Sequence, residues 1–191
     1  MRDNRVIAIA GPQGAGKDTI LYRLVDMIPG LVRGVSCTTR SPRPGEVAGR
    51  DYQYISEAEF EASIAQKRFI DWMPVRHYRS GLPKSELERS PKVVVNVGVS
   101  IARAIQQYAV TQGGKVFSLF VTASERERRR RIMARQPGLA ADELERMITD
   151  DPSPGNVRLS PDFVVVKNPD GMLDITVAAI ADEVRQFLNT R

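Results

Sequence analysis

The sequence contains one cysteine and one histidine in 191 residues, and aromatic residues make up only 6% of it. A single cysteine, Cys37, excludes a disulfide within the chain, and neither Cys37 nor His77 indicates a structural zinc site. No apolar run is long enough to cross a bilayer, and the N-terminus lacks the apolar segment of a signal peptide. We therefore expect a cytoplasmic protein with no membrane partner.

The net charge of +5 is compatible with nucleic acid binding or with a pocket for small polyanions. Proteins that bind single strands interleave aromatic and basic residues, and this chain lacks that pattern. Small phosphorylated ligands are therefore favoured over nucleic acid. The length and the hydrophobic content of 42% predict a single globular domain.

The most informative stretch combines a strand pattern, a glycine-rich turn and a helix pattern. An apolar run covers residues 6–10, and apolar residues recur at helical spacing after residue 17. Between them lies Gly-x-x-x-x-Gly-Lys, which consists of Gly11, Pro12, Gln13, Gly14, Ala15, Gly16 and Lys17. Backbone amides of such a loop surround phosphates, and its lysine reaches the β- and γ-phosphates. The sequence predicts an ATP site here, because an ordinary turn requires neither the lysine nor three glycines.

Two oxygen-bearing side chains follow the lysine. Asp18 stands where this motif usually has a Ser or Thr that binds Mg²⁺, and Thr19 comes next. A carboxylate is also a hard oxygen ligand. We expect Mg²⁺ to accompany ATP, with Asp18 binding it directly or through water, and the predicted ATP site extends over both residues.

The segment 36–46 is polar and rich in proline. Arg40 and Arg43 lie three residues apart between hydroxyl side chains and prolines, an arrangement that can form a preorganised fork for phosphate. Tyr52 can add a phenolic donor to the same phosphate. A solvated basic loop explains these residues equally well.

Strand and helix patterns alternate along the rest of the chain. They predict an α/β fold with a parallel sheet covered by helices on both faces. Strands are expected at residues 31–35, 69–72, 93–97, 115–121 and 162–166, and a turn at 77–83. Helices are expected at 101–108 and 173–188, and two capping boxes open further helices at 56–59 and 124–127.

Two polar residues of these strands are site candidates. Asn96 ends an apolar strand, and ligands of open α/β sheets bind at the carboxyl ends of strands. A simple polar end to the strand is the alternative. The alternation in 69–72 predicts Asp71 on the face opposite Ile70 and Trp72.

An arginine-rich helix pattern follows the second capping box. Arg128, Arg131 and Arg135 share one helix face, and a further helix, capped by Asp142, carries Arg146. A subset of these arginines that closes over a triphosphate explains why the residues are arginine and not lysine. Solvation at the surface explains the remainder.

In order and spacing, these segments resemble the guanylate kinase family over nearly the whole chain. The resemblance rests on the glycine-rich loop, Thr38–Glu46, Asp51-Tyr52, the Phe69–Trp72 box and the arginine-bearing helices. It implies a P-loop kinase of three parts. These are a core (1–35, 84–124 and 157–191), an acceptor-binding subdomain (about 36–83) and a lid (about 125–156).

The resemblance also implies roles for individual residues. Positions that hold the acceptor's phosphate match Ser36, Arg40, Arg43 and Tyr52. Lid arginines that surround the transferring phosphate match Arg131, Arg135 and Arg146. The chain departs from the family mainly where guanine is recognised: Asp71 replaces a glutamate that reads guanine, Leu82 a Ser or Thr that helps recognise the base, and Asn96 an aspartate near the base and metal. Ser80 replaces a tyrosine that contacts phosphate. The other phosphate contacts are thus kept, and the contacts that recognise guanine are altered.

The function implied is transfer of the γ-phosphate of ATP to a phosphate of GMP or a relative. Lys17, Arg40 and the lid arginines would be the catalytic residues of a monomer or homodimer. Two alternatives remain. Lys17-Asp18, Gly81-Leu82-Pro83 and Asn96 are similar to ribose 1,5-bisphosphate phosphokinases, which form phosphoribosyl diphosphate. A non-catalytic guanylate-kinase-like binding module is the other alternative, although such modules are expected to lose the loop lysine or the lid arginines.

Overall fold

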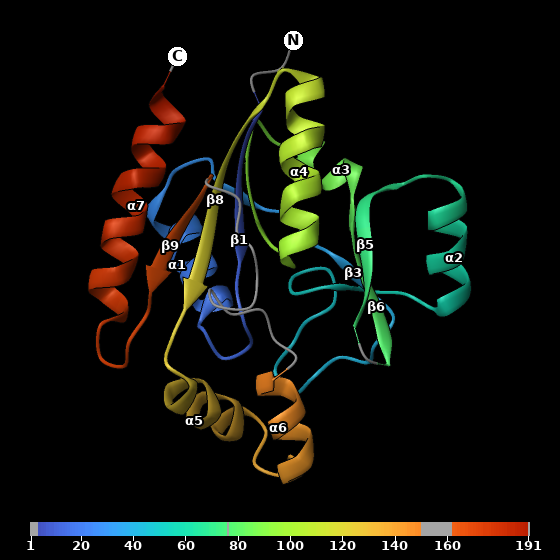
Figure 1. Ribbon diagram of the computed structural model, residues 1–191. Helices are drawn as coiled ribbons and strands as arrows, with labels where there is room; N and C mark the ends of the chain where they lie inside the picture. The colour runs from blue at the N-terminus through green and yellow to red at the C-terminus, as the bar shows by residue number, and fades with distance from the viewer. Residues whose placement is uncertain (1–3, 76, 150–161, 191) are drawn as a thin grey trace.

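The computed structural model describes residues 4–75, 77–149 and 162–190, and its described part contains two β-sheets (Figure 1). The larger sheet has five parallel strands in the order β2-β7-β1-β8-β9. They are β1 (Arg5–Ala10), β2 (Val32–Arg33), β7 (Lys92–Asn96), β8 (Lys115–Thr122) and β9 (Phe163–Lys167). The predicted α/β fold with a parallel sheet is therefore confirmed.

Side chains of the central strand alternate between two core clusters. Ile7 and Ile9 pack against α1 (Lys17–Met27) and α7 (Leu173–Asn189), whereas Val6 and Ala8 pack against α4 (Val99–Gln112). Figure 1 shows α7 and α4 on opposite sides of the sheet. Burial of both faces explains why these strands are continuous apolar runs.

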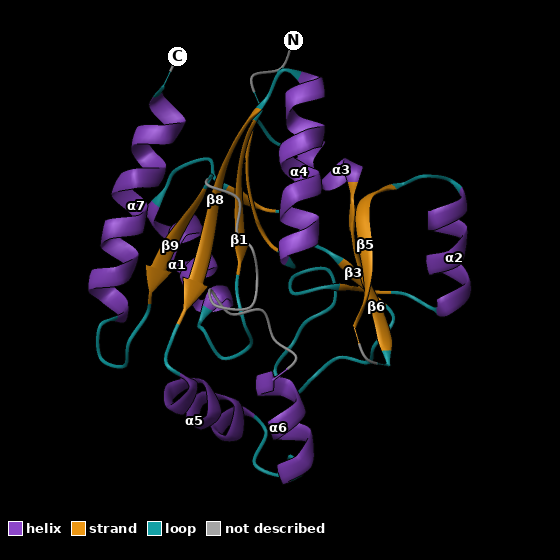
Figure 2. Cartoon of the chain, in the orientation of Figure 1, coloured by secondary structure: helices purple, strands orange, loops and turns teal. Residues whose placement is uncertain are grey.

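The second sheet has the order β4-β3-β6-β5 and was not predicted as a sheet. Its strands are β3 (Cys37–Thr38), β4 (Gln53–Tyr54), β5 (Phe69–Val75) and β6 (Tyr78–Pro83). Figure 2 shows α2 (Glu57–Ala65) on the side of this sheet that faces away from the larger sheet. Phe60 of this helix packs on Phe69, with ring centroids 4.7 Å apart.

The turn predicted at 77–83 is wrong, because most of that segment forms β6. Gly81 and Pro83 suggested a turn, but β6 pairs antiparallel with both β5 and β3. Gly81 serves close packing instead, since a Cβ there would lie 3.0 Å from the Cβ of Trp72. Proline is tolerated because Pro83 pairs with Phe69, where the register of β5 shifts.

The alternation expected in 69–72 is also broken. The register of β5 shifts between Phe69 and Asp71, and Ile70 packs against the same core cluster as Met73. A β-bulge of this kind changes which way the neighbouring side chains point. Ile70 and Met73 therefore contact one cluster, although their spacing predicts opposite faces.

The helices agree with expectation except at some ends. Both capping boxes are present, Ser56 with Glu59 and Ser124 with Glu127. The helix predicted at 101–108 begins earlier, at Val99. Asp142 lies inside the first turn of α6 (Ala141–Thr149) and does not cap it. The other helices are α3 (Lys84–Glu88) and α5 (Glu125–Arg135). The expected boundary between lid and core, at 156/157, lies outside the described residues.

None of the helices in residues 4–75, 77–149 and 162–190 is both long and apolar enough to span a membrane.

Candidate active site

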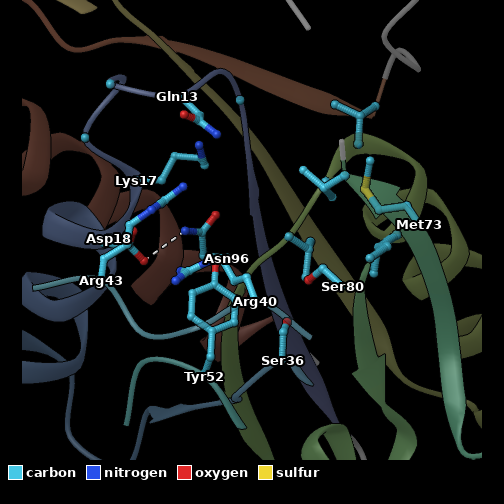
Figure 3. Close-up of a pocket in the computed structure, with 18 of the residues that line it drawn as sticks. Gln13, Lys17, Asp18, Ser36, Arg40, Arg43, Tyr52, Met73, Ser80 and Asn96 are labelled. Atoms are coloured by element: carbon cyan, nitrogen blue, oxygen red, sulfur yellow. Dashed lines mark hydrogen bonds between the residues drawn. The ribbon is translucent and has the colours of Figure 1, made fainter. Parts of the chain in front are cut away.

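A pocket of about 750 Å³ lies where the carboxyl ends of β1 and β7 meet the second sheet and α5 (Figure 3). The predicted ATP-site residues that line it are Gly11, Gln13, Gly14, Gly16, Lys17, Asp18 and Thr19. The predicted acceptor-site residues that line it are Ser36, Arg40, Arg43, Tyr52, Ser80 and Asn96, and the lid contributes Arg131 and Arg135. Pro12, Ala15, Asp71 and Arg146 are not among the lining residues. One cavity thus brings both predicted sites together.

The glycine-rich loop needs glycine at its two ends. Gly11 has φ 138°, and a Cβ there would lie 2.0 Å from the carbonyl oxygen of Val121. Gly16 has φ 94° at the N-terminus of α1, and a Cβ there would lie 2.4 Å from Nδ2 of Asn168. Other residues would clash at both positions and strain the backbone. The glycines therefore fix the loop against β8 and the end of β9.

Three side chains hold the carbonyl groups of this loop. The Nε group of Arg128 donates to the Gln13 carbonyl at 2.9 Å, and Nη1 of Arg131 donates to the Gly14 carbonyl at 3.2 Å. Nδ2 of Asn168 donates to the Ala15 carbonyl at 2.8 Å. Asn168 was not predicted, although it follows β9 as Asn96 ends β7. The rule that ligands bind at the carboxyl ends of strands could have identified it.

Lys17 begins α1 and lines the pocket. Its Nζ group donates to the carbonyl oxygen of Pro12 at 2.9 Å, so the side chain lies along the loop (Figure 3). The ammonium group is thus held beside the loop that is predicted to bind phosphates.

Asp18 is held by two neighbours. Its Oδ1 atom accepts a hydrogen bond from Nδ2 of Asn96 at 2.9 Å, the dashed line in Figure 3. The Nη2 group of Arg33 lies 3.7 Å from the same oxygen. The Asp18 side chain is 49% exposed. Asn96 thus positions the carboxylate at the pocket, which explains the polar residue at the end of β7.

The two arginines of the predicted phosphate fork, Arg40 and Arg43, have different partners. Arg40 binds Glu46 through both Nη groups at 2.7 Å, and its guanidinium lies 4.9 Å from the ring centroid of Tyr52. Glu46 also accepts hydrogen bonds from the Arg43 backbone N–H and the Tyr54 hydroxyl, both at 2.8 Å. Arg40 is therefore fixed by a carboxylate and an aromatic ring, in a segment that was equally compatible with a solvated loop.

Charge pairing shifts the pKa values of this group. Burial alone would raise the pKa of Glu46, but hydrogen bonds from Arg40, Arg43 and Tyr54 lower it to about 2. Burial likewise opposes the charge of Arg40, and Glu46 raises the pKa of Arg40 above its ordinary value. Burial raises the pKa of Tyr52 to about 12, with Asp18 as a further cause. Arg40 and Glu46 are both ionised at neutral pH, and Tyr52 keeps its proton as a hydrogen-bond donor.

Arg43 and Arg135 differ from Arg40 and Arg131, the two arginines of the described pocket lining that are paired with carboxylates. Within the residues that the structure describes, neither the Arg43 nor the Arg135 guanidinium has a carboxylate partner within 4 Å. Desolvation and then the positive charge of Arg43 lower the pKa of Arg135. Two guanidinium groups that repel each other in one cavity favour a polyanionic ligand between them.

The other two lid arginines are placed differently. Arg131 lines the pocket, but its Nη2 group binds Asp170 at 2.8 Å and it also holds the loop. Arg146 pairs with Asp142 one turn earlier on α6, away from the pocket lining. An i,i+4 ion pair on an exposed helix satisfies Arg146 locally. The structure therefore brings Arg131 and Arg135 to the pocket, but not Arg146.

Asp71 is not among the lining residues, although it shares one face of β5 with Met73 and Val75, which are. Its Oδ1 atom accepts a hydrogen bond from the backbone N–H of Trp72 at 2.8 Å, and its neighbour across the sheet is the buried Leu82. Met73, two residues further along β5, lines the pocket in its place. Other lining residues that the sequence did not single out are Val75, Tyr78, Val97, Gly98, Val99, Ser100 and Ile101.

Comparisons with known proteins identify relatives of this chain. The family model described as guanylate kinase matches residues 3–158. The chain is 34% identical over 152 residues to a guanylate kinase of Rubrobacter xylanophilus, covering 78% of each chain. It is 30% identical to a guanylate kinase of a Wolbachia species over 94% of this chain and 93% of the relative. The crystal structure of guanylate kinase from Anaplasma phagocytophilum has a similar fold, with a TM-score of 0.69, 18% identity, and coverage of 99% of this chain and 88% of that one.

Proposed function

Because the chain belongs to the guanylate kinase family, an ATP-dependent kinase family, we propose that it transfers the γ-phosphate of ATP to the phosphate of GMP. One observation of the structure supports the proposal in addition to family membership. Lys17 of the glycine-rich loop and the arginines of the acceptor segment, Arg40 and Arg43, line the same pocket. A donor phosphate and an acceptor phosphate bound at these two places would face each other.

The chemistry requires charge neutralisation more than a base. A phosphate oxygen of GMP is already largely ionised at neutral pH, so it can attack phosphorus without losing a proton to the protein. Catalysis then depends on alignment and on cations around the transferring group. In this proposal Lys17 contacts the β- and γ-phosphates, Arg40 and Tyr52 orient the acceptor phosphate, and Arg43 with Arg135 balances the charge between them.

The remaining residues of the site support these contacts. Ser36 and Ser80 are proposed to bind the acceptor through their hydroxyl groups. Arg131 is proposed to reach the transferring phosphate from its position beside the loop, where Asp170 orients it. Arg146 is proposed to join them only when α5 and α6 move toward the acceptor segment, because Asp142 holds it outside the lining.

The donor groups at Asp18 fit Mg²⁺. In the described residues no group of three His, Cys, Asp or Glu side chains could hold a metal by itself. Mg²⁺ commonly binds to one or two carboxylates, substrate phosphates and water, and Asp18 supplies a half-exposed carboxylate beside the loop. When bound, Mg²⁺ neutralises charge on the β- and γ-phosphates. We assign Asp18 as its protein ligand, positioned by Asn96.

The Asp18→Asn variant is expected to need about tenfold more Mg²⁺ for half-maximal activity. An amide still accepts the hydrogen bond from Asn96 but carries no charge for the cation. The measurement is the Mg²⁺ dependence of turnover and, independently, of ATP binding by calorimetry. Thr19→Val is the matched comparison. An unchanged Mg²⁺ dependence in Asp18→Asn, with a shift in Thr19→Val, would assign the metal to the hydroxyl instead.

The function is tested by ADP release with ATP and Mg²⁺ in the presence of GMP. We expect release that depends on GMP, and the family membership favours this result over the two alternatives. Release with ribose 1,5-bisphosphate but not with GMP would support a phosphokinase of that sugar. ATP binding without release for any acceptor would support a binding module.

The proposal describes a cytoplasmic enzyme of small molecules, either a monomer or a homodimer, that requires neither nucleic acid nor membrane. Light scattering with and without GMP and ATP measures the oligomeric state. A complex larger than a dimer would contradict this part of the proposal.

A further inference from the structure

The pocket has an apolar end opposite the glycine-rich loop. Figure 3 shows Met73 and Ser80 across the cavity from Lys17 and Asp18. The aliphatic side chains of this end are Met73 and Val75 of β5, Val97 of the segment that joins β7 to α4, and Val99 and Ile101 of the first turn of α4. Val97, Val99 and Ile101 are buried in the core, so a flat ring system that enters from the phosphate sites would pack mainly against Met73 and Val75.

Met73 is held firmly in this wall. Its sulfur lies over Gly98, the residue before α4, where a Cβ would approach to 2.5 Å. The Ser100 hydroxyl donates to the same sulfur at 3.8 Å, and Ser80 is the neighbour of Met73 across the sheet. Met73 thus takes a fixed place between β6 and the first turn of α4.

The polar groups at this end are hydroxyls and not carboxylates. In the described part of the lining, Asp18 is the one acidic residue, and it stands beside the loop. Asp71 is turned to the backbone of Trp72. The hydroxyl side chains at Met73 are those of Ser80, its neighbour across the sheet, and Ser100, which donates to its sulfur. The other hydroxyl side chains of the described lining are Ser36 and Tyr52 of the proposed phosphate site, Tyr78, and Thr19 of the loop.

Guanine and adenine differ in the polarity of one edge. Guanine presents a ring N–H and an amino group there, and a fixed carboxylate accepts from both. A hydroxyl can donate or accept, so it satisfies the edge of either base. Sites built from fixed hydrogen-bonding groups reject the wrong ligand by about 10⁴-fold or more, whereas apolar pockets reach only about 10- to 200-fold.

We propose that the base end of this pocket binds purines through apolar contact with the Met73 wall and discriminates only weakly among them. Met73 is then the residue that limits selectivity for guanine. This inference rests on the proposed function, since it concerns the acceptor nucleotide of the same reaction. It extends the substrate class from GMP to purine nucleoside monophosphates.

The test is kcat/KM of the natural protein for GMP, IMP and AMP, each with ATP and Mg²⁺. The expected result is that GMP exceeds IMP and AMP by less than about 100-fold. A preference for GMP over AMP above about 10⁴-fold would overturn the inference while leaving the proposed function intact. Absence of turnover with every nucleotide would overturn both.

Three variants test whether Met73 determines the selectivity between GMP and AMP. Met73→Glu places a carboxylate of similar length in the wall and is expected to raise the ratio of GMP to AMP at least about tenfold. Met73→Leu keeps the wall apolar, so any change in KM should affect both nucleotides equally. Met172→Glu makes the same substitution at an exposed methionine outside the pocket lining and should leave the ratio unchanged. Equal ratios in Met73→Glu and the natural protein would remove Met73 from the selectivity.

Discussion

Replacing Lys17 with alanine is expected to lower kcat about a thousandfold or more while the protein remains folded. The ammonium group lies beside the loop. It is proposed to stabilise the negative charge that develops on the transferring phosphate. Its hydrogen bond to the Pro12 carbonyl contributes only about 1 kcal/mol to stability. The expected signature is therefore a large loss of turnover with a small change in melting temperature.

The measurement pairs steady-state kinetics with thermal unfolding. Lys167→Ala, at an exposed lysine outside this pocket lining, is the matched control and should keep normal turnover. A folded Lys17→Ala protein that turns over GMP within tenfold of the natural rate would exclude Lys17 from the mechanism.

Replacing Arg40 with alanine is expected to cause two losses that can be separated. The variant leaves Glu46 charged without its main partner, although the two side chains are only 10% and 20% exposed in the natural protein. Removing one partner of a largely buried pair costs about 3 kcal/mol of unfolding free energy. Loss of a charge-assisted contact to the acceptor phosphate should also raise KM for GMP about 100-fold.

The double variant Arg40→Ala/Glu46→Ala separates the two effects. It removes both charges, so it should recover most of the stability but none of the affinity for GMP. Urea unfolding is best measured near neutral pH, because the low pKa of Glu46 stabilises the fold above about pH 4.5 and this contribution is lost as the pH falls toward 2. A double variant with normal KM for GMP would show that Arg40 acts only through the fold.

The parts of the fold that the sequence predicted are those with local physical causes. The glycine-rich loop, both capping boxes and the apolar strands depend on residues close together in the chain, and all of them are present. In contrast, β6 was predicted as a turn because Gly81 and Pro83 favour turns locally. Pairing with β5 and β3, which is not local, overrides that preference.

The site residues likewise divide into those that local sequence predicts and those that depend on contacts distant in the chain. Motif spacing found the loop and the arginines of the acceptor segment, but it could not find the Arg40–Glu46 pair, since both residues were compatible with a solvated loop. Asp71 was expected at the base because its position in the sequence matches the family pattern. Asp71 and Met73 share one face of β5, but the Asp71 carboxylate accepts from the backbone of Trp72, and Met73 is the one of the two that lines the pocket. Asn168 escaped notice because its partner, the Ala15 carbonyl, is 153 residues distant.

The central claim is direct phosphoryl transfer between two ligands of one pocket. The most direct test follows ATP labelled in its γ-phosphate with ¹⁸O by ³¹P NMR, in the presence of GMP and Mg²⁺. The account predicts that the label appears in the β-phosphate of GDP, with no labelled inorganic phosphate. Label found only in inorganic phosphate would show hydrolysis instead of transfer and would contradict the claim.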